Sequence, residues 1–330
     1  MVITFPVTIF HKTLTSSIAM LLICATLAAP STSASTALWK ETETAKHQLS
    51  ITVARGKWGQ TTILDIHRLL VSVASEFHSY AGFNRARDID IRVVPRNGSP
   101  RVLYERGTDG SYVIHLTARD DRWYQYAYQF AHELCHIYSN FDHKERDKHG
   151  SVSIKNQWFE ESLCEAAAVH TLKRLALSWE HNPPTRSWIG YSQIFANYAD
   201  YLLRQPHRQL PESLSLIDWY QKHHQVLRAN PYLREKNEQV ATRMLRIFEQ
   251  NPQFWSAIGY LNQNPASAGR SFADYLADWQ KAAPAQQKML PTKIMALFGI
   301  NTDNTYIASV HRGSLLREQG SLSPKPQQTR

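Results

Sequence analysis

The stretch from Gln129 to Asn140, QFAHELCHIYSN, constrains this chain most, because two histidines lie four positions apart with a glutamate directly after the first. In an α-helix, positions i and i+4 lie about one turn apart on the same side, so His132 and His136 can bind one zinc ion together. The intervening Glu133 is rotated by about 100° and can reach a metal-bound water without binding the metal itself. Zinc lowers the pKa of its water, and Glu133 can accept the proton as general base.

The residues around this motif predict that it lies on a helix. Asp120 or Asp121 can act as N-cap of a helix that runs to about Asn140. Four apolar residues recur at helical spacing and form one face of it: Ala127, Phe130, Leu134 and Ile137. The two histidines are therefore expected on an adjacent face.

A second strong helix is expected over residues 158–179, WFEESLCEAAAVHTLKRLALSW. Glu161 and Glu165 are four positions apart on one face of it, and Glu161 follows His136 by 25 positions. One of these carboxylates can bind zinc while the other accepts the second N–H of a ligand histidine.

The two motifs together resemble those of the gluzincin metallopeptidases, the thermolysin-like zinc enzymes with an HExxH helix and a helix that carries a ligand glutamate. In that family the ligand glutamate is followed four residues later by an acidic residue, and ESLCE has this spacing. The resemblance covers about residues 110–170. It implies His132, His136 and Glu161 as zinc ligands, Glu133 as general base and Glu165 as a residue that supports a ligand.

A different third ligand is also open. Asp142 follows His136 by six residues, where metzincin-like enzymes carry a ligand. Those enzymes need a glycine three residues after the second histidine, and here that residue is Ser139. Asp142 and the adjacent His143 stay as alternatives to Glu161.

The family's downstream residue that stabilises the oxyanion has five equal candidates: Tyr191, Tyr198, Tyr201, His223 and His224. A GAMEN-like exopeptidase motif is absent from the sequence, which favours an endopeptidase.

The pattern before and after the motif predicts an α+β fold. Three β-prone pieces, residues 89–95, 101–107 and 111–117, are separated by Asn-Gly and Asp-Gly turns, which favour an antiparallel meander. By resemblance to the zincin sheet, residues 111–117 would line the cleft and hold an extended substrate by strand addition. Beyond Pro184 only helical patterns follow, so an all-helical C-terminal part is expected.

The N-terminus has the layout of a signal peptide. Lys12 precedes an apolar run over residues 18–29, followed by small residues, so cleavage is expected near Ala34–Ala37. An uncleaved membrane anchor is the alternative, although the run is too short to favour a stable transmembrane span. The expected organisation is a signal peptide, a zincin-like catalytic domain, a helical C-terminal subdomain and a flexible tail: residues 1–34, 35–182, 183–312 and 313–330.

Export bears on the cysteines. Removal of the leader takes away Cys24 and leaves Cys135, inside the first motif, and Cys164, inside the second. An even number of cysteines in an exported protein invites a disulfide. We expect one between Cys135 and Cys164, which would clamp the two ligand helices together.

The charge narrows the class of partner. The formal net charge is +9 with no block of five or six like charges, so the excess is dispersed rather than arranged as a nucleic-acid stripe. The sequence thus predicts a periplasmic or secreted zinc metallopeptidase acting on a peptide or protein substrate. The alternative is a non-catalytic envelope protein with a structural or degenerate zinc site, which binds a partner through its helical C-terminal part.

Overall fold

The fold is described from a computed structural model, which places residues 3–7, 49–82, 88–211 and 213–301. Within these residues the chain forms a five-stranded sheet with strands β1 (Ile3–Val7), β2 (Leu49–Val53), β3 (Ile89–Pro95), β4 (Arg101–Val102) and β5 (Tyr112–Leu116). It also forms helices α1 (Ile63–Ala81), α2 (Trp123–Tyr138), α3 (Gln157–His181), α4 (Ser192–Leu203), α5 (Leu216–Ala229), α6 (Arg234–Gln250), α7 (Phe272–Ala282) and α8 (Met289–Leu297). The expected α+β class is confirmed, with mainly helical structure after β5.

The pairing of the strands differs from the expected meander. The strand order is β1-β2-β3-β5-β4; β3 pairs in parallel with both β2 and β5, and only β4 and β1 pair antiparallel with their neighbours. Both glycine turns form, with positive φ at Gly98 and Gly110. However, β4 has only two residues and pairs on β5 alone, so β5 lies between β3 and β4.

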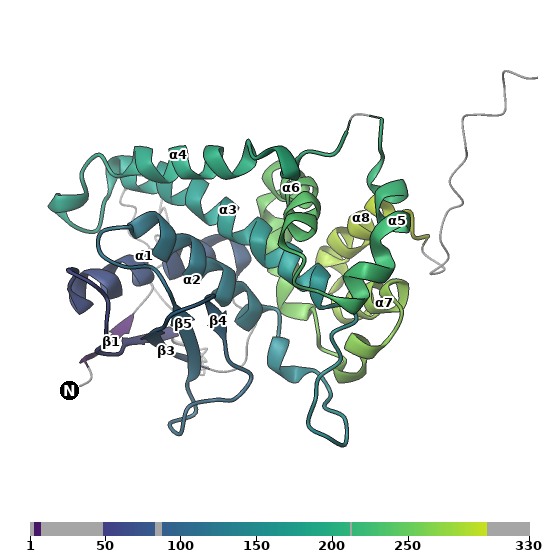
Figure 1. The fold of residues 1–330 in the computed structure, drawn as a ribbon, viewed down its shortest axis with the longest axis horizontal. Coiled ribbons are helices and arrows are strands. Elements are labelled where there is room, and N and C mark those ends of the chain that lie inside the picture. Colours follow the sequence, from purple (N-terminus) through teal and green to yellow (C-terminus); the bar gives the residue numbers. More distant parts are fainter. Residues whose placement is uncertain (1–2, 8–48, 83–87, 212, 302–330) are drawn as a thin grey trace, which may run out of the picture.

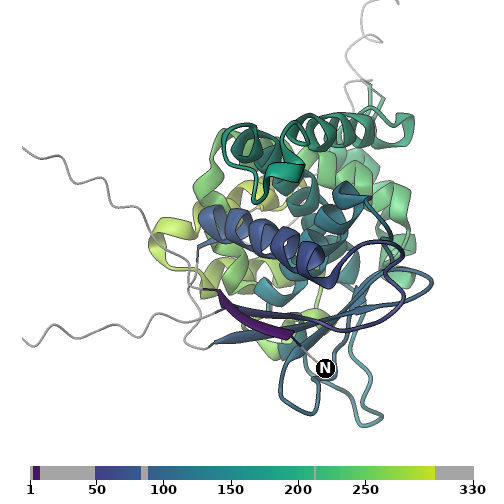
Figure 2. The same cartoon turned by 90° about the vertical axis from the view of Figure 1, so that its left-hand side faces the viewer.

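The register of β3 on β5 has a physical reason. In the parallel register, buried residues of β3 stand beside buried residues of β5, with pairs Ile91–Tyr112 and Val93–Ile114. This places both sets of side chains on the face that the helices cover, and a shift of one residue would expose one set. Figures 1 and 2 show α1 and α2 lying over this face.

The two motif helices form as expected. The apolar face of α2 is fully buried through Ala127, Phe130, Leu134 and Ile137. The predicted caps of α2 are wrong: the helix begins after Arg122 without a side-chain cap. Asp120 instead has a left-handed backbone with φ 56° and accepts a hydrogen bond from the backbone N–H of Gln60 at 2.9 Å.

Helix α3 lies at the centre of the molecule and packs against α2, α4 and α6 (Figure 1). Most of its circumference is buried, and small residues at Ala166, Ala167 and Ala168 allow close approach of neighbouring helices. The helix ends at His181, next to the expected boundary between residues 182 and 183. Buried side chains of the sheet, of α3 and of the helices after it belong to one hydrophobic cluster.

The C-terminal part is helical, but one segment differs in type. The pattern over residues 252–262 predicts a helix, and residues Pro252–Tyr260 form 3-10 turns rather than an α-helix. This segment, η4, packs on α1 and α6. Asn262 follows it with a left-handed backbone at φ 56°.

The ends of the chain fall mostly outside the described residues. Apart from β1, the expected signal peptide lies outside the described residues, and so do Cys24 and the cleavage zone at Ala34–Ala37. The expected tail over residues 313–330 also lies outside them. Strand β1 lies within the expected leader and pairs antiparallel with β2. Among the helices that the structure describes, none has the length and apolar character needed to cross a membrane.

Candidate metal centre

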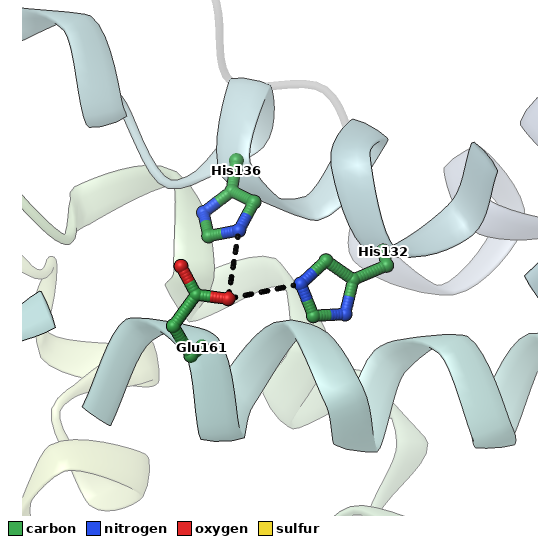
Figure 3. A group of neighbouring side chains, drawn as sticks. All are labelled: His132, His136 and Glu161. Carbon is green, nitrogen blue, oxygen red and sulfur yellow. Dashed lines mark hydrogen bonds and ion pairs between the residues drawn. The ribbon is translucent and has the colours of Figure 1, made fainter. Parts of the chain in front are cut away.

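Helices α2 and α3 lie side by side and bring three side chains together. His132 and His136, one turn apart on α2, both turn Nε2 toward a single carboxylate oxygen, Oε2 of Glu161 on α3 (Figure 3). The two Nε2–Oε2 distances are 3.2 and 3.6 Å. One ligand atom from each of the three residues lies within 4.8 Å of the others, so this group can hold a metal ion.

The spacing is compatible with zinc. Zinc is bound tetrahedrally by imidazole nitrogen and carboxylate oxygen at about 2.0–2.2 Å, so neighbouring ligand atoms stand about 3.4 Å apart. The two nitrogen–oxygen distances lie on either side of this value. Two neutral imidazoles and a carboxylate are also a donor set that zinc accepts.

The glutamate between the histidines lines a cleft that the three grouped residues also line. Glu133 is 4% exposed, and its Oε2 accepts a hydrogen bond from the backbone N–H of Val102 on β4 at 2.7 Å. Burial raises the pKa of its carboxyl, while the charges of His132 and His136 oppose the rise. A carboxyl held in position with a raised pKa is suited to both accept and return a proton.

Glu160, directly before Glu161, contacts the other side of His136. Its Oε1 lies 2.8 Å from Nδ1 of His136, and its Oε2 lies 2.6 Å from Nζ of Lys144. Burial opposes ionisation of Glu160, but Lys144 and His136 together lower its pKa to about 2. The carboxylate is therefore ionised and accepts the Nδ1–H of His136, which leaves Nε2 as the metal-binding nitrogen.

Glu165 stands near the corresponding nitrogen of His132. Its Oε2 is 3.9 Å from Nδ1 of His132, which is longer than a hydrogen bond. The carboxylate accepts instead from the hydroxyl of Tyr128 and, at 2.5 Å, from Nη2 of Arg208, a guanidinium that is 1% exposed. In this structure Glu165 is thus held beside His132 without bonding it.

The electrostatics of the three grouped residues favour a cation. Burial opposes ionisation of Glu161, yet the charge of His136 and the hydrogen bond with His132 hold its pKa well below the usual range. Burial also lowers the pKa of both histidines, but the net pKa of each is raised by Glu161, together with Glu133 for His132 and Glu160 for His136. The ionised Glu161 carboxylate therefore stabilises a positive charge at this position.

The two alternative third ligands lie elsewhere. Asp142 accepts a hydrogen bond from Nη2 of Arg106 at 2.7 Å, and this ion pair holds its pKa below the usual value despite burial. Neither Asp142 nor His143 belongs to the metal-binding group found among the described residues. The geometry selects Glu161 as the third member.

The cleft around this group has a volume of about 1000 Å³. It is lined by residues 99–105, which contain the edge strand β4, and by side chains of α2, α3 and the start of α6. The expectation that residues 111–117 line the cleft as its edge strand is wrong, because β5 lies inside the sheet and β4 forms the edge. Of that stretch, Thr117 reaches the cleft.

Of the five candidate residues for an oxyanion donor, Tyr198 lines the cleft. His223 and His224 place Nδ1 against backbone carbonyls of their own helix, and Tyr191 approaches the carbonyl of Asp121. Tyr201 lines an adjoining hollow.

Tyr232, which was not among these candidates, also lines the cleft. The residue is 64% exposed, and its partial burial, followed by the charge of Glu161, raises the pKa of its phenol. It lies between α5 and α6 in a short turn without a motif, so no local sequence signal marked it.

The expected disulfide is not formed. Cys135 and Cys164 are both fully buried free thiols. The two side chains are close enough to share a hydrogen bond. Burial, followed by this bond, raises the pKa of the Cys164 thiol. The helices approach each other here as a packed apolar contact rather than through a covalent link.

Comparisons with known proteins add little. No protein-family model matches the chain, and no curated protein matches it. Among solved structures, an aminopeptidase N family protein from Idiomarina loihiensis is similar with a TM-score of 0.29 and 15% sequence identity. The match covers 71% of this chain and 45% of that chain. A likeness this low carries no argument about activity, so a function has to rest on the site.

Proposed function

We propose that this protein is a zinc-dependent peptidase in which His132, His136 and Glu161 hold the metal and Glu133 is the general base. The observation that carries the proposal is the shared approach of both Nε2 atoms to Oε2 of Glu161 at 3.2 and 3.6 Å. It is supported by the position of Glu133, whose carboxylate lines the same cleft.

Zinc in this position would polarise a peptide carbonyl and lower the pKa of a water molecule. The protein's own part of the reaction falls to Glu133. The hydrogen bond from the N–H of Val102 occupies Oε2 and fixes the plane of the carboxyl. Its raised pKa lets it take a proton from water and return that proton to the leaving amine.

The substrate would lie in an extended form along β4. This strand is the edge of the sheet and lines the same cleft as the two histidines. In the antiparallel pair with β5, Leu103 donates its N–H to Val113, so the backbone groups of the adjacent Val102 point away from β5. Its N–H bonds Glu133, and its carbonyl is placed to accept from a peptide that adds to the edge.

Tyr232 is the residue we assign to the oxyanion. The phenol shares the cleft with the metal-binding group and is influenced by the charge of Glu161, whereas Tyr198 is influenced by that of Glu165. A neutral phenol with a raised pKa remains a hydrogen-bond donor throughout the working range of such an enzyme.

A structural zinc site is less well supported. Structural zinc is normally enclosed by four protein ligands, whereas catalytic zinc has three and an open position. The group found in the described part of the chain has three members and faces a cleft of about 1000 Å³. The open position favours turnover of a substrate over a purely structural role.

The protein is further proposed to be exported. The support is the N-terminal order of a basic residue, an apolar run and small residues before Ala34–Ala37. Cleavage there would remove β1 and make β2 the outer strand of the sheet.

The decisive activity test compares the wild type with Glu133→Gln, both loaded with zinc. Substrates are peptides acetylated at the N-terminus and amidated at the C-terminus, which only an endopeptidase can cleave. We expect the wild type to cleave internal bonds and the variant to keep one zinc and lose at least about 10²-fold in kcat. Full activity of Glu133→Gln would overturn the proposed mechanism. Cleavage restricted to peptides with a free terminus would retain the zinc chemistry and change the class to exopeptidase.

A further inference from the structure

Two asparagines join the end of helix α2 to the turn after η4 in a reciprocal arrangement. Asn140 donates from Nδ2 to the carbonyls of Gly259 and Leu261, both at 2.8 Å. Asn262 donates from Nδ2 to the carbonyl of Ser139 at 2.9 Å, in the opposite direction. Both side chains are almost completely buried, and both backbones are left-handed, with φ 57° and 56°.

Asn262 also reaches the metal centre. Nδ2 of Asn262 lies 2.9 Å from Oε2 of Glu160, the carboxylate whose other oxygen bonds His136. The contacts of Asn140 in this arrangement run to backbone carbonyls. The pair therefore offers two similar asparagines, of which Asn262 is linked through Glu160 to the histidine ligand.

The orientation of the Asn262 amide follows from its third contact. Oδ1 lies 2.9 Å from the hydroxyl of Tyr275, which is fully buried with its pKa raised well above the usual value by burial. A neutral phenol donates to the amide oxygen, so Nδ2 must face Glu160 and Ser139. Tyr275 belongs to α7, which ties this amide to the C-terminal helices.

Without Asn262, Oε2 of Glu160 would be held by Lys144 alone. A lysine has a flexible four-carbon stem and does not fix the plane of a carboxylate as a rigid amide does. Rotation of Glu160 would tilt or release the imidazole of His136, because Oε1 accepts its Nδ1–H. Partners that orient a ligand histidine in this way commonly change metal affinity by about 10- to 100-fold.

We propose that Asn262 is a positioning residue of the metal centre. It fixes Glu160, which in turn fixes the ring of His136, and through it the C-terminal helices pre-organise the ligand that α2 supplies. This inference rests on the proposed zinc site and gives a specific role to the helical part that follows α3.

The test compares Asn262→Gly with Asn140→Gly in the full chain. Glycine adopts the left-handed conformation without strain, so each substitution keeps the backbone and removes only the amide. Zinc affinity is measured by competition with a chromophoric chelator, and the Co²⁺-substituted proteins are compared by their visible absorption spectra. We expect Asn262→Gly to weaken zinc binding by about 10- to 100-fold and to alter the Co²⁺ spectrum.

Asn140→Gly is the matched control: it loses the two buried hydrogen bonds to Gly259 and Leu261, whereas Asn262→Gly loses the contact with Glu160. We expect it to lower the Tm while its zinc affinity stays within about 3-fold of the wild type, with an unchanged Co²⁺ spectrum. Equal effects of the two substitutions on affinity and spectrum would overturn the positioning role. Failure of the wild type to bind one zinc would instead overturn the proposed function itself.

If Asn262→Gly does not fold, Tyr275→Phe decides the question. It removes the hydroxyl that orients the amide and retains the buried ring. We expect zinc affinity to fall by about 3- to 10-fold with a shifted Co²⁺ spectrum, a smaller change than full removal of the orienting partner gives. Wild-type affinity and spectrum in Tyr275→Phe would contradict the proposal.

Discussion

Glu160 and Glu161 are neighbours in the sequence, yet they contact opposite sides of the same histidine ring. Glu161 faces Nε2 of His136, and Glu160 bonds Nδ1 at 2.8 Å. Consecutive residues of a helix point about 100° apart, so two neighbouring side chains of α3 can contact the His136 ring from two directions. One carboxylate is then free to bind a metal while the other fixes the ring.

Replacement of Glu160 tests the second of these roles. We expect Glu160→Gln to weaken zinc binding by about 10- to 100-fold, because a neutral amide holds the Nδ1–H of His136 less strongly. It should also lower the free energy of unfolding by about 3 kcal/mol, since Lys144 is left as a buried charge without its counter-ion. Zinc competition and urea denaturation of the metal-free protein measure the two effects.

A second substitution separates them. Adding Lys144→Met removes the unpaired charge, so most of the stability should return while zinc affinity remains low. If the double variant regained wild-type zinc affinity, Glu160 would act on the fold rather than on His136.

Tyr232→Phe tests the assignment of the oxyanion donor. Loss of one hydrogen-bond donor to a developing oxyanion typically lowers kcat by about 10²- to 10³-fold. We expect a loss in that range with unchanged zinc content, measured by steady-state kinetics on the blocked peptides. Tyr201→Phe, in the adjoining hollow, is the control and should retain near wild-type kcat. A similar loss in both variants would argue against a specific role for Tyr232.

His170 predicts how stability depends on pH. Its ring is packed between Tyr80 and Trp255, and neither ring nitrogen has a hydrogen-bond partner among the described residues. Burial, followed by the charges of Arg174 and Lys173, lowers its pKa to about 4. In the unfolded chain the value is about 6.5, so between pH 6.5 and 4 the unfolded state binds more protons and stability falls as pH falls.

The expected loss from His170 between pH 7 and pH 5 is about 2 kcal/mol. His170→Phe keeps an aromatic ring and should remove this part of the pH dependence in urea denaturation of the metal-free protein. His181→Gln, at the exposed end of α3, serves as control and should retain the wild-type slope. An unchanged slope in His170→Phe would show that the ring is already charged or solvated in the folded state.

The thiols give a direct check on the packing between α2 and α3. Cys135 and Cys164 are buried and unbonded, so they should resist alkylation in the native protein and react fully in denaturant without a reductant. Mass spectrometry of the denatured, alkylated protein should show both cysteines modified. A mass two units lower, with neither cysteine alkylated, would establish the disulfide that the sequence suggested.

The leader is tested by N-terminal sequencing of protein recovered from outside the cytoplasm. We expect the mature chain to begin within the zone after Ala34–Ala37. An intact Met1 on cell-associated protein would favour the membrane anchor instead.

The features that the sequence predicts correctly depend on local helical spacing. His132, Glu133, His136 and Glu161 could be grouped because helical spacing is local, and a helix places i and i+4 residues together wherever it packs. The same logic predicted the buried face of α2.

The remainder depends on contacts between distant parts of the chain. The hydrogen bond of Asn262 with Glu160 spans 102 positions, and no local pattern marks either partner. The strand pairing differs from the expected meander because turn signals indicate where a chain reverses, not which strand lies beside it. Asp142 was a reasonable ligand by spacing, but Arg106, 36 positions earlier, pairs with it.

We propose that one zinc ion is held by His132, His136 and Glu161. The most direct test is a calorimetric titration of zinc into the metal-free wild type and into the metal-free Glu161→Gln variant. We predict one equivalent bound by the wild type and an affinity lowered by at least about 100-fold in the variant, because a carboxylate ligand becomes a weakly coordinating amide. Equal zinc affinity and stoichiometry in the two proteins would contradict the account.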